Sequence, residues 1–182
     1  PGATTARISC DLPTRTAGGN ELKGLINVAI VVDGDTVQIK ENQSPGAEFS
    51  ISLVLTNGLH VLKVICLNSG GEGVAASIKT FTGEDMPQIP TEVTAVAEES
   101  GKVTLSWTLP EAGINGGWVN LTKVSYDILR NGESLSTDIK ETTYIDNLPE
   151  NELKSYKYTV IVKFGGEECG SVESNSVVFG KA

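Results

Sequence analysis

The chain has 182 residues, of which 23 are acidic and 14 basic, so its formal net charge at pH 7 is −9. This charge repels polyanions and argues against nucleic acid or an anionic membrane surface as a partner. No apolar run approaches the ~20 residues of a membrane-spanning helix, so we expect no membrane insertion by this segment. Because Pro1 is not a native start, we expect the chain to be part of a longer protein whose targeting signal lies elsewhere.

An internal repeat organises the sequence. Residues 5–13 read T-A-R-I-S-C-D-L-P and are echoed by K-V-T-L-S-W-T-L-P at 102–110. Cys10 aligns with Trp107 at an offset of 97 positions (10 to 107), and the closing prolines align at the same offset. In both segments apolar and polar residues alternate, which is typical of a half-buried strand that ends at the proline.

The repeat predicts two all-β domains of one kind, 1–86 and 87–182, because no segment has helical periodicity. Asp33-Gly34 and Asn131-Gly132 align between the copies and favour two-residue hairpin turns, since both residues of each pair tolerate positive φ. After the first echoed strand, further strands are expected at 25–32, 36–40, 49–55, 60–67 and 74–82 in the first half. After the second, they are expected at 123–130, 133–137, 142–146, 156–164 and 174–179.

One strand is expected in the second half alone. Residues 91–96, T-E-V-T-A-V, precede the echoed strand, and the matching positions in the first half would lie ahead of residue 1. The first domain should therefore lack its opening strand, and an uncovered strand edge invites pairing with another chain. The boundary at 83–90 contains two prolines, so we expect a semi-rigid spacer there.

The second half carries the residues of a family resemblance. It opens with P-T-E-V-T at 90–94, places Trp107 on its second strand, and reads L-P at 148–149 followed by Y-T-V-I-V at 158–162. In this respect residues 87–182 resemble a fibronectin type III domain, which implies an immunoglobulin-like β-sandwich. The first half matches through its alignment to the second, although it has Cys10 in place of the tryptophan and Leu62 in place of the tyrosine.

The sequences of three short segments make the resemblance more specific. The segments G-E-D-M-P at 83–87, G-I-N-G-G-W-V at 113–119 and Y-D-I-L-R-N-G at 126–132 are similar to the tandem fibronectin-type repeats of exported and surface proteins in Bacteroides-type bacteria. This similarity implies an extracellular, cell-surface or periplasmic location. The triplet D-T-V around Thr36 also resembles the site at which such bacteria O-glycosylate exported proteins, and a chance match is the alternative.

The resemblance also bears on the three cysteines. In an immunoglobulin-like sandwich, the strands that carry Cys10 and Cys66 lie in opposite sheets and face each other across the core. The two residues then form either a disulfide in an oxidising compartment or a pair of buried thiols. Cys169 is expected in an exposed loop without a partner.

No catalytic, cofactor-binding or metal-binding residue is predicted. The G-x-G-x-x-A run at 71–76 resembles a dinucleotide fingerprint, but the next segment is short and rich in strand-forming residues, so we interpret the run as a turn. His60 is the sole histidine, and we expect it to be a partly buried structural residue. The acidic pairs at 98–99 and 167–168 are expected to be solvated charges in loops.

Trp118 follows two glycines in a loop, and loop aromatics on a rigid sandwich either bind ligands or fold back on their own domain. The sequence therefore predicts a non-enzymatic spacer or protein-interaction (adhesion-type) module of a larger secreted protein. The alternative is an accessory carbohydrate-binding pair of a secreted hydrolase, with Trp118 stacking on polysaccharide. No cofactor is expected in either case.

Overall fold

The computed structural model describes residues 2–181, which form two compact units that divide between Glu84 and Asp85. Each unit is an immunoglobulin-like β-sandwich, so the predicted fold class of two such sandwiches in tandem is confirmed. The predicted domain boundary lay slightly later, at Met86. Each unit is described below by itself.

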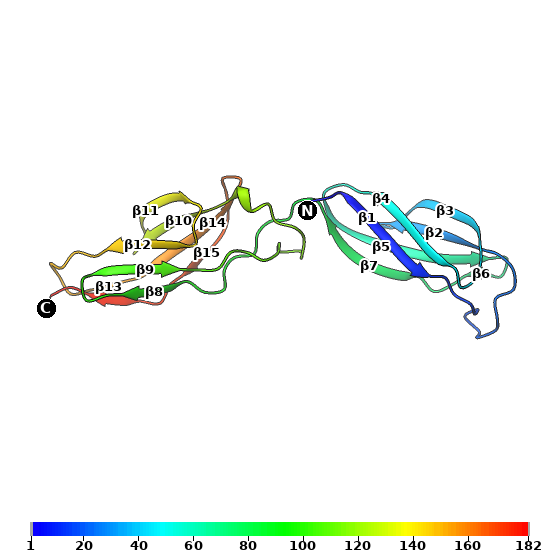
Figure 1. The fold of residues 1–182 in the computed structure, drawn as a ribbon, viewed down its shortest axis with the longest axis horizontal. Coiled ribbons are helices and arrows are strands. Elements are labelled where there is room, and N and C mark those ends of the chain that lie inside the picture. Colours follow the sequence, from blue (N-terminus) through cyan, green and yellow to red (C-terminus); the bar gives the residue numbers. More distant parts are fainter. Residues whose placement is uncertain (1, 182) are drawn as a thin grey trace. The chain divides into compact units, whose positions relative to one another are not determined.

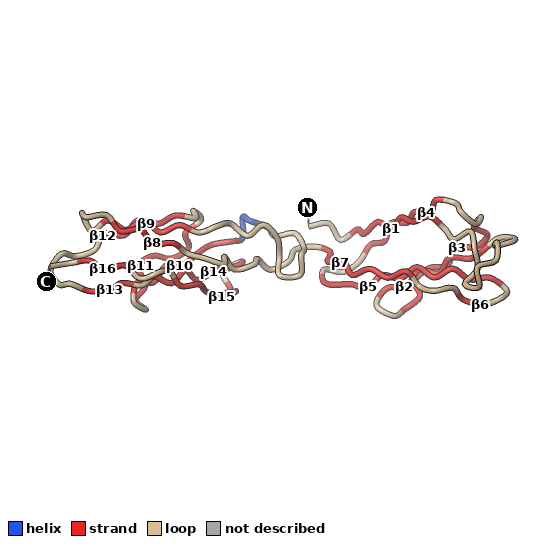
Figure 2. Tube along the Cα trace, turned by 90° about the horizontal axis from the view of Figure 1, so that it is seen from below, coloured by secondary structure: helices blue, strands red, loops and turns tan. Residues whose placement is uncertain are grey.

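Unit 1 is a small two-stranded sheet packed on a larger one (Figure 1, Figure 2). In the small sheet β1 pairs antiparallel with β4, and in the large sheet β5 lies between β2 and the final strands of the unit. The strands are β1 (Thr5–Asp11), β2 (Ile26–Val32), β3 (Asp35–Gln43), β4 (Glu48–Val54), β5 (Gly58–Asn68), β6 (Gly71–Glu72) and β7 (Ala76–Thr82).

The predicted hairpin between β2 and β3 forms a tight two-residue turn. Asp33 has φ 54° and Gly34 has φ 100°, the left-handed values that an Asp-Gly pair adopts at low cost. The equivalent turn of unit 2 has φ 48° at Asn131 and 87° at Gly132. Both dipeptides thus set the register of the strands that follow them.

Among residues 2–181, unit 1 has no strand ahead of β1, as predicted. Among the same residues, β1 pairs only with β4. The residues just before β1 do not run along its other edge, because the carbonyl of Ala3 accepts a hydrogen bond from Gly83 N and that of Thr4 accepts one from Leu55 N. The core of the unit is correspondingly small and is formed by Leu12, Ile26, Val28, Ile30, Phe49 and Val64.

Unit 2 has the full set of strands. A three-stranded sheet in the order β12-β9-β8 packs on a four-stranded sheet in the order β11-β10-β14-β15, and a short β13–β16 pair extends the second layer. The elements are β8 (Thr94–Ala97), β9 (Lys102–Ser106), η1 (Leu121–Lys123), β10 (Val124–Arg130), β11 (Glu133–Ile139), β12 (Thr143–Asn147), β13 (Lys154–Tyr156), β14 (Tyr158–Phe164), β15 (Glu167–Glu173) and β16 (Val177–Phe179).

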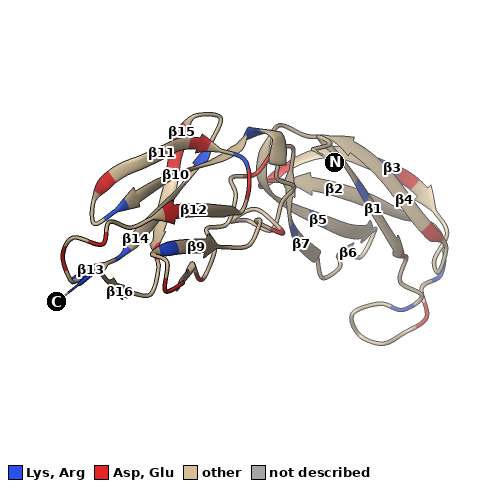
Figure 3. Ribbon diagram, turned by 60° about the vertical axis from the view of Figure 1, so that its left-hand side comes forward, with Lys and Arg blue, Asp and Glu red and all other residues tan. Residues whose placement is uncertain are grey.

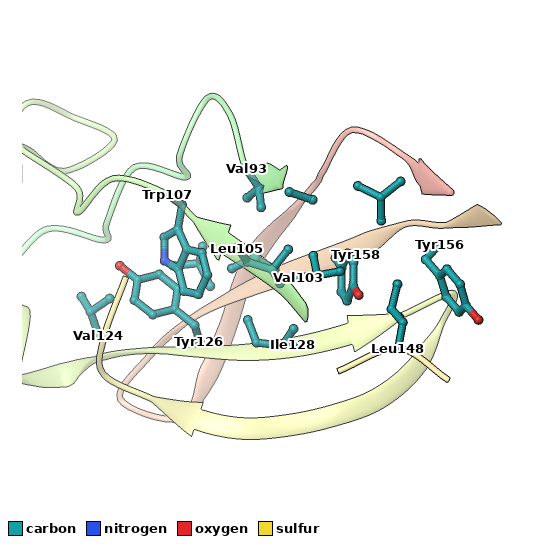
Figure 4. Close-up of a cluster of buried hydrophobic side chains, with 14 of the residues drawn as sticks. Val93, Val103, Leu105, Trp107, Val124, Tyr126, Ile128, Leu148, Tyr156 and Tyr158 are labelled. Carbon is teal, nitrogen blue, oxygen red and sulfur yellow. The ribbon is translucent and has the colours of Figure 1, made fainter. Parts of the chain in front are cut away.

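The core of unit 2 is built around the echoed strand. Trp107, just after β9, is 7% exposed, and its ring meets Tyr126 edge to face with centroids 5.2 Å apart and planes at 69° (Figure 4). Leu105, Val103 and Tyr158 are fully buried on the same side. The apolar members of the predicted alternation therefore face inward up to Trp107, whereas Leu109, which the alternation also placed inside, lies beyond the strand and is 48% exposed.

The last strand of unit 2 begins earlier than predicted. Gly165-Gly166 adopts φ values of 61° and 90° and turns the chain directly after β14, so that it re-enters the sheet at once. Cys169, expected in an exposed loop, therefore lies on β15 and is half-buried. The Glu167-Glu168 pair also lies on this strand, where both side chains are exposed.

The expectation of a spacer over 83–90 is wrong for residues 85–88. Asp85 is 2% exposed and Pro87 is fully buried within unit 2. The carbonyl of Met86 accepts a 2.9 Å hydrogen bond from Ile114 N, and Gln88 N donates to the carbonyl of Ala112. Residues 85–88 are thus an integral part of unit 2.

Candidate functional site

One buried carboxylate, that of Asp85, organises the long loop between β9 and η1. Its Oδ2 accepts hydrogen bonds from Asn115 N (2.8 Å) and Gly117 N (3.0 Å). Its Oδ1 accepts from Met86 N (2.9 Å) and from the side-chain amide of Asn115 (3.0 Å). Four donors around one acceptor group fix the loop in a single conformation.

The surroundings of Asp85 favour the ionised form. Burial by itself raises the pKa of this carboxyl, but the hydrogen bonds from Asn115, Gly117 and Met86 outweigh burial and hold the pKa below its ordinary value. Gly113 packs directly on the carboxylate, and a Cβ at this position would collide with it. The G-I-N-G-G sequence of the loop is therefore suited to wrapping a negative charge.

Three exposed apolar side chains lie on this loop and on the segment that pairs with it, and we call them the Trp118 surface. Met86, Ile114 and Trp118 are 43%, 60% and 39% exposed. They are held together through the backbone, since Asp85 N donates to the carbonyl of Trp118 (2.7 Å) and Ile114 N donates to that of Met86 (2.9 Å). Trp118 therefore does not fold back fully on its own domain.

The polar side chains near Trp118 are engaged within the loop. Asn115 donates from its amide to Asp85, and Asn120 Oδ1 accepts from the backbone N and the hydroxyl of Thr122. A sugar site combines an aromatic platform with polar groups that can bond to hydroxyls. Trp118 supplies such an aromatic platform on this loop.

His60 is the most buried titratable group of unit 1. It is 7% exposed, its Nδ1 lies 2.7 Å from Asp33 Oδ2, and its Nε2 lies 2.9 Å from the carbonyl oxygen of Thr56. The hydrogen bond to Asp33, followed by that to Thr56, raises the pKa of His60. As expected from the sequence, the residue is structural, since it joins the β2–β3 hairpin to β5.

Cys10 and Cys66 are free thiols on facing sheets and pack against the same core. Burial raises the pKa of both thiols, and the neighbouring Cys10 raises that of Cys66 further. A raised pKa leaves little thiolate at neutral pH, so neither residue is suited to be a nucleophile. Their disulfide stays a prediction for the oxidised protein.

Thr36 lies near the start of β3, opposite Val31, and its side chain is exposed. The flanking residues Asp35 and Val37 are exposed as well, so a modifying enzyme could reach the whole triplet. O-glycosylation of Thr36 stays a prediction.

Two groups of half-buried charges in unit 2 form pairs. Arg130 and the hydroxyl of Tyr158 both donate to Asp146 Oδ2, at 2.9 and 2.8 Å. Lys163 Nζ donates to Asp127 Oδ2 at 2.9 Å. These contacts join strands to one another, which indicates a structural role.

The other sequence motifs take no part in a site. The G-x-G-x-x-A run enters β6 and then β7 without a helix, so it is no dinucleotide fingerprint, and the turn itself lies just before the run, at residues 69–70. Within residues 2–181, no three His, Cys, Asp or Glu side chains gather as metal ligands. The same residues include no helix that is long and apolar enough to cross a membrane. Acidic and basic side chains are interspersed over the strands and loops of each unit (Figure 3).

Asp85 is the functional residue that the sequence analysis missed. Its position between a glycine and two prolines is typical of a linker, and its partners lie about thirty residues further along the chain. The one available signal was the glycine-rich loop at 113–117, which offers several backbone N–H groups without a regular structure to use them.

Comparison with known proteins adds distant similarity only. No protein-family model matches the chain, and no curated protein matches it. The chicken CNTN1 FN1–FN3 domains match with 14% identity and a TM-score of 0.39 over 99% of this chain and 65% of that one. The chicken interferon gamma receptor alpha chain matches with 10% identity and a TM-score of 0.44 over 88% of each chain. This chain thus spans less than two thirds of the CNTN1 structure, and the fold assignment above depends on strand order.

Proposed function

We propose that the chain is a pair of non-catalytic modules that act as spacer or protein-interaction domains within a larger exported protein, located extracellularly, on the cell surface or in the periplasm. The observation that carries the proposal is the Trp118 surface, where exposed apolar side chains stand on a loop that a buried carboxylate holds rigid. Rigid exposed apolar groups are typical of protein contacts.

The electrostatics and titratable groups support this function. The net charge of −9 disfavours nucleic acid as a partner. The buried ionisable groups serve as hydrogen-bond partners between strands, as in the Tyr158–Asp146–Arg130 group. The sequences of segments 83–87, 113–119 and 126–132 support a bacterial source of the Bacteroides type. The exposed D-T-V triplet around Thr36 supports export.

A photo-crosslinking residue placed at Trp118 tests the interaction role. Only the backbone of Trp118 is needed to bond Asp85, so the replacement leaves the loop intact. We expect one defined protein of the native host to be captured at position 118, and none at position 178, where Val178 is 64% exposed on β16. Equal capture at both positions would remove the support for a specific interaction surface.

The alternative function, carbohydrate binding beside a hydrolase, makes the opposite prediction. Binding on a polysaccharide array that disappears in Trp118→Ala would favour it, as would a catalytic domain encoded next to this segment. Turnover of any substrate by the purified chain would contradict a non-catalytic role altogether.

The disulfide prediction provides a test of export. Protein secreted into an oxidising compartment is denatured without reductant and alkylated. A single modified thiol that maps to Cys169 means that Cys10 and Cys66 are bridged, whereas three modified thiols mean that no bridge forms and remove this support for export.

A further inference from the structure

The outer face of the large sheet in unit 1 is rich in apolar side chains. On β2, Ala29 and Val31 alternate with the core residues Val28 and Ile30, so they point away from the core. Strand pairing places residues of β3, β5 and β7 on the same face. Its apolar members are Ala29, Val31, Ile39, Val61, Ile65 and Leu67. Unit 1 therefore has apolar side chains on the outside of this sheet as well as on the inside.

In unit 2 the equivalent face carries an ion pair. Lys163 Nζ donates to Asp127 Oδ2 over 2.9 Å, which joins β14 to β10. Strand pairing makes Ala29 the equivalent of Asp127 and Leu67 the equivalent of Lys163. The two copies thus differ here, since unit 1 has apolar residues where unit 2 has paired charges. Contiguous apolar side chains on an outer face are typical of an interaction site.

Two lysines lie at the centre of this face in unit 1. Val61 pairs with Lys79, and Lys63 follows two residues later on β5, so the lysines are diagonal neighbours, about 7–8 Å apart. Among the residues that the structure describes, neither lysine takes part in an ion pair. The acidic Glu72 lies at the far end, beside Leu67. We call these apolar residues and the two lysines together the lysine face.

The three-stranded sheet of unit 2 has an outer face that complements the lysine face. Val96, Thr104 and Ile145 form one row across β8, β9 and β12, and the two apolar residues are 58% and 54% exposed. Beside this row, Glu92 lies in a shallow hollow of about 240 Å³. Its lining includes the hydroxyl residues Thr91, Thr94, Ser106 and Thr108. Within residues 2–181 no basic side chain pairs with Glu92. We call this surface the Glu92 face.

We propose that copies of the chain associate head to tail, with the lysine face of one copy on the Glu92 face of the next. The row of Ile39, Ala29 and Ile65 crosses three strands, as does the row of the Glu92 face. Adjacent strands lie about 4.8 Å apart in any sheet, so the two apolar rows have equal widths. A lysine ammonium that enters the hollow meets a carboxylate, which makes a charge-assisted hydrogen bond.

The distribution of charge favours a second copy as the occupant of the lysine face. Residues 1–84 have six basic and eight acidic side chains, and residues 85–182 have eight and fifteen, so the formal charges are −2 and −7. Unit 2 of another copy therefore attracts the lysines. Two lysine faces would repel each other, because four ammonium groups would meet. The contact is thus between unlike faces, and it extends to a ring or an open chain of copies.

Sedimentation equilibrium of the intact chain tests the association. We expect the average mass to rise with protein concentration, up to about 1 mM, and to pass the mass of a dimer. Raising the ionic strength from about 0.01 M to about 1 M should weaken the association, because salt screens exposed charges. Lys63→Glu combined with Lys79→Glu should weaken it about tenfold or more, and Glu92→Lys should do the same.

Mixing the two charge variants provides the decisive measurement. Each variant alone brings like charges together across the contact. In the mixture, the glutamates of one variant face the lysine at position 92 of the other, and the lysines of the second face Glu92 of the first. We therefore expect the mixture to associate as the unaltered chain does. A variant that had simply failed to fold would not regain association on mixing.

The controls separate these two faces from net charge and from the Trp118 surface. Lys23→Glu combined with Lys40→Glu changes the charge equally, at exposed lysines outside the lysine face, and should leave association unchanged. Trp118→Ala should also associate normally. This association adds a partner to the protein-interaction role proposed above but uses separate surfaces, so crosslinking at position 118 and self-association can fail independently.

Several results would overturn the proposal. One is a chain that stays monomeric at every concentration and low ionic strength. Another is a dimer that does not grow and persists in the lysine variant. A mixture that associates no better than its two components would exclude the pairing of these faces. Binding of a monomeric chain to phosphatidylserine vesicles, lost in the lysine variant, would assign the lysines to a lipid surface instead.

Discussion

The carboxylate of Asp33 and the imidazole of His60 lie 2.7 Å apart, joining the β2–β3 hairpin to β5. The second ring nitrogen of His60 faces the carbonyl oxygen of Thr56. Both partners are acceptors, so only the doubly protonated imidazolium can donate to each of them. Asp33 also accepts from Val61 N (2.8 Å), and this bond, followed by that from His60, lowers the pKa of Asp33.

Unit 1 should therefore be most stable in mildly acidic solution. His60 has a raised pKa in the folded state, so its contribution is complete below its unfolded pKa of about 6.5 and is lost as pH rises through the folded value. Asp33 has a lowered pKa, so its contribution is lost as pH falls through the folded value. Urea unfolding from pH 3 to pH 9 should show a maximum between roughly pH 4 and 6.5.

Asp33→Asn keeps the turn residue and removes the charge, as Asn131 does in unit 2. Above pH 6, the stability of this variant should depend less on pH than that of the unaltered chain. The neighbouring control Asp35→Asn should leave the pH dependence of stability unchanged. An unaltered profile in Asp33→Asn would show that the pair does not set the pH dependence.

Two buried tyrosines of unit 2 should respond differently to loss of the hydroxyl. Tyr158 donates to Asp146, and burial, followed by this hydrogen bond, raises the pKa of the phenol. Tyr158→Phe leaves the carboxylate with Arg130 as its remaining side-chain partner and should cost about 1.5–3 kcal/mol. The Tyr126 hydroxyl is buried and has only a weak, poorly aligned partner in the Trp107 side chain, so Tyr126→Phe should cost less than about 1 kcal/mol. Denaturant titration measures the stability of both variants. Equal losses of stability would contradict the different hydrogen bonding of the two hydroxyls.

Removal of the Asp85 carboxylate should loosen the loop and destabilise unit 2. Asp85→Ala leaves three backbone N–H groups, those of Met86, Asn115 and Gly117, without their acceptor, at a total cost of about 2 kcal/mol or more. Hydrogen exchange at Asn115 and Gly117 should accelerate. Glu111→Ala removes an exposed carboxylate of the same loop and is the matched control. Unchanged exchange in Asp85→Ala would show that the loop is held by other contacts.

Truncation of Trp107 should strongly destabilise unit 2. Trp107→Ala should cost about 3–5 kcal/mol, because the cavity removes the edge contact with Tyr126 as well as buried area. Its indole nitrogen has at most a weak partner in the Tyr126 hydroxyl, so Trp107→Phe should cost clearly less. Thermal unfolding measures the stability of both variants. An equal loss of stability in Trp107→Phe and Trp107→Ala would indicate that the indole nitrogen makes an important hydrogen bond.

The sequence predicts what depends on local signals. Alternation located β1 and β9, and the two hairpin dipeptides located their turns, because in each case neighbouring residues determine the backbone. Comparison of the two copies also predicted the missing strand. The hydrogen bonds of Asp85 could not be predicted from the sequence, because the donors are backbone groups of a distant loop, and no side chain identifies them. The early start of β15 was missed because Gly165-Gly166 was not recognised as a hairpin turn.

The carboxylate of Asp85 precedes the first strand of its own domain, yet it folds a loop on the far side of β9. The segment that must be kept together for unit 2 to form completely therefore begins at Asp85. A recombination event or an expression boundary placed at Pro87 or Pro90 would transmit every strand of unit 2 while leaving behind the carboxylate that holds the loop between β9 and η1 in shape. Tandem copies of such a module can be exchanged intact only if the acidic residue before the prolines travels with the strands that follow it.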